Sequence, residues 1–143
     1  MIGEMKVFKY EIHKRFKLRD EELIFKALDF AVEKHKDQKR ETGEPYIIHP
    51  IAVATILLQY GLDAKAISAA LLHDVVEDSG VTPDELKVMF GEEVAELVNG
   101  VSRVKTLRYK SSANENDESL RKMFLAMAKD IRVIFIKLAD RLH

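Results

Sequence analysis

The centre of this fold is predicted by one segment of the chain, which reads Ile67-Ser-Ala-Ala-Leu-Leu-His-Asp-Val-Val-Glu-Asp78. Asp63 is a suitable N-cap and Gly80 a suitable stop, so the pattern predicts one helix of about four turns. Apolar side chains point in nearly every direction around this helix. A helix without a wide polar face is normally a central, buried one.

Two polar residues, His73 and Asp74, interrupt the apolar segment. An unpaired buried carboxylate costs several kcal/mol, so Asp74 needs a partner. For this pair alone, a core histidine hydrogen-bonded to an aspartate is the commoner arrangement, and a cation held by both is the alternative. Glu77 and Asp78 follow four residues later, on the same face of a helix. Acidic side chains oppose the macrodipole at a helix C-terminus, which favours a chemical role for this second pair.

The composition excludes several classes of protein. The chain has 143 residues, 47% hydrophobic and 33% charged, which suffices for one globular domain with its own core. A formal net charge of -1 gives no basic field for nucleic acid or an acidic membrane, and no apolar run reaches transmembrane length. Cysteine is absent, so any metal must be bound by histidine and carboxylates. The start of the chain lacks a signal-peptide core, and a cytoplasmic protein is expected.

Helical spacing of apolar residues recurs along the rest of the chain. Residues 1–19 are mixed and basic, and we expect an arm or short helix ahead of a domain over residues 20–143. Further helices are predicted over residues 20–39, 50–60, 83–90, 92–105, 120–128 and 131–143. Residues 106–119 have loop composition. His35 falls on the inner face of its helix, where a hydrogen-bonded structural histidine is expected. The sequence therefore predicts an all-α fold, and its end without a cap is typical of a C-terminally truncated domain.

Three separate motifs resemble the HD family of metal-dependent phosphohydrolases. They are Arg40-Glu-Thr-Gly-Glu-Pro-Tyr-Ile-Ile-His-Pro50, Ala70-Leu-Leu-His-Asp-Val-Val-Glu-Asp78 and Asp130-Ile-Arg-Val-Ile-Phe-Ile-Lys-Leu-Ala-Asp-Arg-Leu-His143. The closer match is to the hydrolase domain of the RelA/SpoT family, which degrades the alarmone (p)ppGpp, and it extends from Leu23 to the end of the chain. The resemblance implies an HD-domain helical bundle. Glu41 departs from the pattern, because the family commonly has a basic residue there.

The resemblance also implies roles for individual residues. Four of them are implied metal ligands: His49, His73, Asp74 and Asp140. Mn²⁺ is the usual ion, although two imidazoles and two carboxylates also suit iron, cobalt or zinc. An acidic pair is implied to act on the attacking water and the leaving group: Glu77 and Asp78. Three residues are implied to lie at the nucleotide pocket: Arg40, Thr42 and Tyr46.

The implied activity is that of a guanosine-3′,5′-bis(diphosphate) 3′-diphosphatase. Metal-dependent hydrolysis of the 3′-pyrophosphate of (p)ppGpp would give GDP or GTP and pyrophosphate, with this guanine nucleotide as the partner. One alternative is an HD phosphohydrolase that acts on another nucleotide. A second is a catalytically silent regulatory HD module of a (p)ppGpp synthetase, against which the presence of every implied ligand argues.

Overall fold

A computed structural model of the chain describes residues 2–76, 80–111 and 130–143. The regular structure of these residues is helical, apart from one isolated bridge between Lys39 and Pro45. The helices are α1 (Ile2–Arg15), α2 (Leu18–His35), α3 (Ile48–Gln59), α4 (Ala64–Leu72), α6 (Pro83–Phe90), α7 (Glu92–Ser111) and α9 (Ile131–Leu142). The all-α prediction is confirmed. No helix within the described ranges is both long and apolar enough to cross a membrane.

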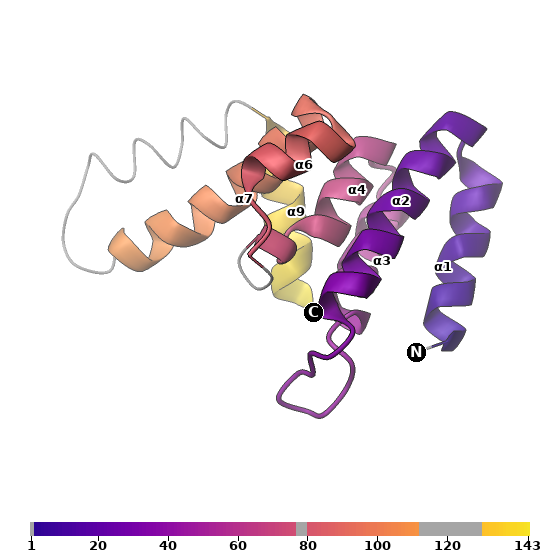
Figure 1. The fold of residues 1–143 in the computed structure, drawn as a ribbon, viewed down its shortest axis with the longest axis horizontal. Coiled ribbons are helices and arrows are strands. Elements are labelled where there is room, and N and C mark those ends of the chain that lie inside the picture. Colours follow the sequence, from indigo (N-terminus) through magenta and orange to yellow (C-terminus); the bar gives the residue numbers. More distant parts are fainter. Residues whose placement is uncertain (1, 77–79, 112–129) are drawn as a thin grey trace.

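Helix α4 is the centre of the bundle. It packs against α2, α3, α7 and α9, and Figure 1 shows it between α2 and α3 on one side and α7 and α9 on the other. Every residue of α4 except Lys65 is buried, as a helix without a polar face requires. Its N-cap is Asp63, whose side chain accepts a hydrogen bond from the Ala66 N–H at 2.9 Å. The predicted central helix is therefore confirmed.

The predicted length of this helix is wrong. Helix α4 ends at Leu72, His73 and Asp74 form a turn, and helical structure resumes at Val75. The His73 ring donates through Nδ1 to the Ala70 carbonyl at 2.6 Å. An uninterrupted helix would offer that carbonyl to the Asp74 N–H, so the side chain competes with the backbone for it. The turn moves His73 and Asp74 from the middle of a helix to its end.

Helices α6 and α7 begin where the sequence predicted, and α7 ends later than predicted. Thr82 caps α6 by accepting from the Glu85 N–H at 3.1 Å, as predicted. Helix α7 continues to Ser111, so the loop predicted from residue 106 is wrong as far as that residue. A nucleated helix adds residues readily, and this segment contains good helix formers such as leucine, arginine and lysine. The rest of that loop and the helix predicted over 120–128 lie outside the described residues.

The terminal helices pack on opposite sides of α3. Helix α1 buries Phe8 and Ile12 and contacts α2 and α3 (Figure 1). The division of the chain at residue 20 stays a prediction. The last segment is a helix, as predicted, and α9 buries Val133 and Ile136 against its neighbours. Asp130 caps α9 by accepting from the Arg132 N–H at 2.9 Å.

Candidate metal centre

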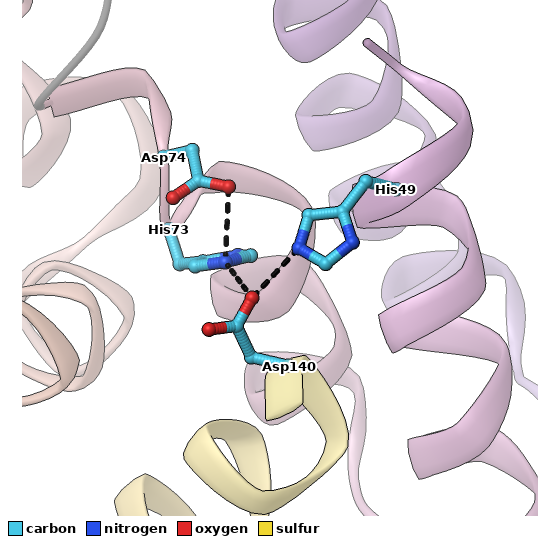
Figure 2. Close-up of side chains that lie close together, drawn as sticks. All are labelled: His49, His73, Asp74 and Asp140. Carbon is cyan, nitrogen blue, oxygen red and sulfur yellow. Dashed lines mark hydrogen bonds and ion pairs between the residues drawn. The ribbon is translucent and has the colours of Figure 1, made fainter. Parts of the chain in front are cut away.

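Four side chains from three places in the sequence meet in the interior. His49 lies in the first turn of α3, His73 and Asp74 lie in the turn after α4, and Asp140 lies in the last turn of α9. Figure 2 shows the four pointing toward one another. Their potential ligand atoms all lie within 4.8 Å of one another. The side chains are at most 12% exposed, so the cluster is shielded from bulk water.

The spacing of the ligand atoms suits a single ion. Asp140 Oδ1 lies 2.7 Å from His49 Nε2 and 3.1 Å from His73 Nε2. Asp74 Oδ2 lies 3.1 Å from the same His73 nitrogen. Atoms bound about 2.0–2.2 Å from one metal ion are themselves ~3 Å apart. Two imidazole nitrogens with two carboxylate oxygens are a ligand set for a borderline divalent cation, so the residues present fit a metal ion.

Local sequence explains how two of these side chains are held. Pro50 follows His49 in the first turn of α3, where the missing N–H is not needed and the fixed φ suits a helix. Asp140 continues the buried face of α9, four residues after Ile136 and seven after Val133. The apolar face that docks α9 therefore also carries the carboxylate into the interior.

Two further hydrogen bonds orient the cluster. The His73 Nδ1 donates to the Ala70 carbonyl, which leaves Nε2 facing the carboxylates. The Tyr46 hydroxyl donates to Asp74 Oδ2 at 2.7 Å. Tyr46 was predicted to lie at the substrate pocket, and the structure places it against an implied metal ligand. Its contact with substrate stays a prediction.

The buried carboxylates hold a proton on His73. Burial by itself would lower the pKa of this imidazole, but hydrogen bonds to Asp140 and Asp74 outweigh burial and raise the pKa to about 9. The negative charge of Asp74 and the Ala70 carbonyl act in the same direction. A proton and a metal ion require the same lone pair on His73 Nε2, so they compete for this site.

A tight loop over residues 36–47 carries the residues predicted to bind substrate. Arg40 N–H donates to the Glu44 carbonyl at 2.8 Å, and Gly43 N–H donates to the Arg40 carbonyl at 2.8 Å. The turn needs a positive φ at Gly43, where φ is 90°. Thr42 is exposed in this turn. The Arg40 guanidinium reaches the end of α9, where Nη1 lies 3.3 Å from His143 Nδ1.

Comparison with known proteins identifies the family. Residues 27–143 match the family model of the HD domain. The chain belongs to the HD-domain family. A solved structure, described as a metazoan ortholog of SpoT that hydrolyzes ppGpp and plays a role in starvation responses, matches with a TM-score of 0.65 and 35% identity. That match covers 84% of this chain and 66% of the other. The predicted HD-domain helical bundle is confirmed.

Two bacterial relatives of this HD domain carry the name guanosine-3′,5′-bis(diphosphate) 3′-pyrophosphohydrolase. The protein from Aquifex aeolicus is 54% identical over 121 residues, which cover 85% of this chain and 17% of the relative. The protein from Borreliella burgdorferi is 46% identical over 138 residues, which cover 96% of this chain and 21% of the relative. The chain thus spans about a fifth of the length of these relatives.

The acidic pair predicted to do the chemistry in this HD domain was Glu77 and Asp78. Both residues lie outside the described part of the chain, which is described as far as Val76 and again from Gly80. Their roles stay predictions.

One residue of the HD domain that lies at the cluster was not singled out from the sequence. His143 Nδ1 lies 3.0 Å from His49 Nδ1, and the two rings stack with their centroids 5.3 Å apart. Burial, together with the neighbouring His49 and Arg40, lowers the pKa of His143 below its ordinary value. The signal in the sequence was its position three residues after Asp140, on the same face of a helix.

His35 is the histidine that the sequence predicted to be structural. It is buried, and its Nδ1 lies 3.1 Å from Gln38 Oε1.

Proposed function

We propose that this chain is a metal-dependent hydrolase of the 3′-pyrophosphate of ppGpp and pppGpp. Water is consumed, and the products are GDP or GTP and pyrophosphate. The observation that carries the proposal is the convergence of His49, His73, Asp74 and Asp140 at one buried point. The names of relatives that are 46–54% identical supply the substrate.

The proposed ion is Mn²⁺, held by those four side chains. A divalent cation supplies Lewis acidity toward water and a phosphoryl oxygen in sites of this kind. The protein contributes hydrogen bonds that hold the ligand side chains in position. Tyr46 holds the Asp74 carboxylate by a hydrogen bond, and the Ala70 carbonyl holds the Nδ1 proton of His73. The low exposure of the cluster keeps competing water away from the ligand atoms.

Proton transfer is assigned to the acidic pair after the cluster. Glu77 would take a proton from the attacking water or orient it, and Asp78 would serve the leaving oxygen. Arg40, Thr42 and Tyr46 are proposed to contact the nucleotide. A guanidinium offers several donors to a phosphate, and Arg40 lies at the end of α9 that carries Asp140.

The decisive experiment separates the products of ppGpp hydrolysis by ion-exchange chromatography, with Mn²⁺ and with a chelator. We expect GDP and pyrophosphate in equal amounts, formed only with the metal. Release of orthophosphate, or turnover in the chelator, would contradict the mechanism. GTP and GDP as competing substrates test the alternative of a different nucleotide, and metal binding without turnover of any nucleotide would identify the silent module.

Two alanine variants test whether Asp74 binds the metal and Glu77 serves the chemical step. Asp74→Ala should lose both metal and turnover, because it removes a ligand. Glu77→Ala should keep the metal, measured by elemental analysis after gel filtration, and lose turnover. Equal loss of metal in the two variants would discredit the assignment of Glu77.

A further inference from the structure

We propose that His143 is a positioning residue for the metal ligand His49. Its Nδ1 accepts the hydrogen bond from His49 Nδ1–H, and this keeps His49 Nε2 available to the ion. The inference rests on the metal site of the proposed function and deepens it, because it names the partner that orients one ligand. His143 contacts the implied ligand His49 and is not one of the four implied ligands.

The geometry gives His49 two different partners on its two nitrogens. Nε2 faces the cluster, 2.7 Å from Asp140 Oδ1. Nδ1 faces away from it, 3.0 Å from His143 Nδ1. Among the described residues, His143 is the contact within hydrogen-bond distance of His49 Nδ1. His49 is buried, so this nitrogen depends on a protein partner more than an exposed one would.

The chemistry of an imidazole then fixes the direction of the bond. A neutral ring carries one proton, so a nitrogen that binds a metal leaves the proton on the other nitrogen. With Nε2 toward the ion, His49 Nδ1 is a donor and needs an acceptor. His143 Nδ1 accepts that proton only when its own proton lies on Nε2. Metal-binding histidines generally have such an acceptor, which sets the tautomer and the ring orientation.

Arg40 holds His143 in this accepting state. The guanidinium has donors and no acceptor, and its Nη1 lies 3.3 Å from His143 Nδ1. Its Nη2 also donates to the His143 carbonyl at 3.4 Å. Both neighbours of His143 Nδ1 are therefore donors, and the proton of that ring is directed to Nε2. The residue predicted to contact the nucleotide thus also supports the ligand shell.

A neutral acceptor suits the charge of this cluster. The two carboxylates among the four ligands match the two charges of a divalent ion, and Lys137 Nζ lies 3.4 Å from the outer oxygen of Asp140. Many metal-bound histidines donate instead to a carboxylate, which would add a third negative charge beside the ion. Histidine at position 143 orients His49 without adding that charge.

The test compares two substitutions that each keep one property of the ring. His143→Asn keeps an acceptor, because the side-chain amide oxygen can take the place of Nδ1. His143→Phe keeps a stacked ring and has no acceptor. By isothermal titration of the full chain with Mn²⁺, we expect His143→Phe to bind ~10–100-fold more weakly than the wild type and His143→Asn to stay within about threefold. Equal affinity in wild type and His143→Phe, or equal loss in both variants, overturns the inference.

A measurement on the wild type keeps the inference testable if a variant does not fold. In the Zn²⁺-loaded chain, two-bond ¹H–¹⁵N correlation spectra should report His49 as the Nδ1–H tautomer, and an Nε2–H tautomer overturns the inference. His13→Phe is the matched control, since His13 is 76% exposed and its ring contacts the buried Glu21, which is not a member of the cluster. Its Mn²⁺ affinity should equal that of the wild type. A wild type that binds no Mn²⁺ refutes the proposed function itself, whereas binding that ignores position 143 refutes this inference alone.

Discussion

Helix α9 carries an ionic cluster near each end, and the two clusters differ in where their positive charge comes from. Near its start, Arg132 contacts three carboxylates at 2.6–2.8 Å: Asp63, Glu93 and Asp130. We call these four residues the arginine cluster, and His49, His73, Asp74 and Asp140 the metal cluster. The side chains of the arginine cluster are 21–56% exposed, against at most 12% for the metal cluster.

The arginine cluster has its own permanent cation, and the metal cluster has none among its members. A guanidinium is charged at every accessible pH, whereas imidazole is charged only when protonated. Lys137 approaches the metal cluster, but its Nζ lies 3.4 Å from Asp140 Oδ2 and not at the oxygen shared by the two histidines. The oxygens that face the two histidines, Asp74 Oδ2 and Asp140 Oδ1, lie where a proton on His73 or a metal ion would offset their charge. We therefore propose that the first cluster docks α9 and that the second binds a metal ion.

The largest expected effect comes from removing a carboxylate of the metal cluster, and the matched loss of a charge from the arginine cluster should leave activity nearly unchanged. Asp74→Ala should lower ppGpp hydrolysis by at least ~1,000-fold, because a metal ion contributes several kcal/mol to such reactions and each 1.36 kcal/mol is tenfold in rate. Arg132→Met should leave kcat/KM within about threefold of the wild type, because this side chain touches no member of the metal cluster. Initial rates at saturating Mn²⁺ measure both. If both variants lost comparable ppGpp hydrolysis activity, the proposed difference in function between the two clusters would be wrong.

A smaller effect is expected from the hydrogen bond that orients Asp74. Tyr46→Phe removes the hydroxyl that donates to Asp74 Oδ2 and keeps the ring. Loss of a partner of this kind typically costs 10–100-fold in metal affinity, and we expect about tenfold in Mn²⁺ titrations. The matched control is Tyr60→Phe, because Tyr60 is 73% exposed on the surface. If Tyr46→Phe changes turnover but not metal affinity, Tyr46 acts on the substrate and not through Asp74.

The stability of the metal-free protein should depend on pH through His73. The folded pKa of this ring is about 9 against an ordinary 6.5, so its protonation stabilises the fold fully below pH 6.5. That stabilisation is lost as the pH rises through about 9. Saturating Mn²⁺ should reverse the trend across the same window, because the metal binds the neutral ring.

Thermal unfolding in a chelator between pH 6 and 9.5 measures the dependence on pH. His73→Asn, which cannot titrate, is the control and should lose the slope that belongs to this ring. A wild type and a His73→Asn variant with parallel profiles would show that the carboxylates do not hold a proton on His73.

The sequence predicted those parts of the molecule that depend on local pattern. The apolar residues around α4 required burial, and Thr82 and Asp63 supplied caps. The convergence of His49, His73, Asp74 and Asp140 was implied by the family resemblance and not by local pattern, and their role as metal ligands stays a prediction. The turn at His73 was not predictable, because it depends on a side chain that competes with the backbone for the Ala70 carbonyl. The partner of His49 was missed because its contact with His143 exists only when α9 lies beside α3.

The smallest expected effect is on stability and comes from the arginine cluster. Hydrogen bonds from Arg132 lower the pKa of Asp130 and of Glu93 below their ordinary values. Partly exposed ion pairs contribute little, so Arg132→Met should lower the free energy of unfolding by about 1 kcal/mol. Depressed carboxylate pKa values stabilise the fold above the ordinary pKa, and this contribution is lost as the pH falls through the folded values. The difference between wild type and variant, measured by urea unfolding, should therefore be largest near neutral pH and shrink below pH 4.

Lys65→Met serves as the control for that measurement, because Lys65 forms an ion pair with the same Glu93 and, among the described residues, forms none with Asp63 or Asp130. It should cost less than Arg132→Met. If Arg132→Met costs nothing at any pH, the apolar contacts of Val133 and Ile136 dock α9 without help. If it also weakens Mn²⁺ binding, the two ends of α9 are coupled. The position of Asp140 would then depend on the arginine cluster, and the separation of docking from metal binding would no longer hold.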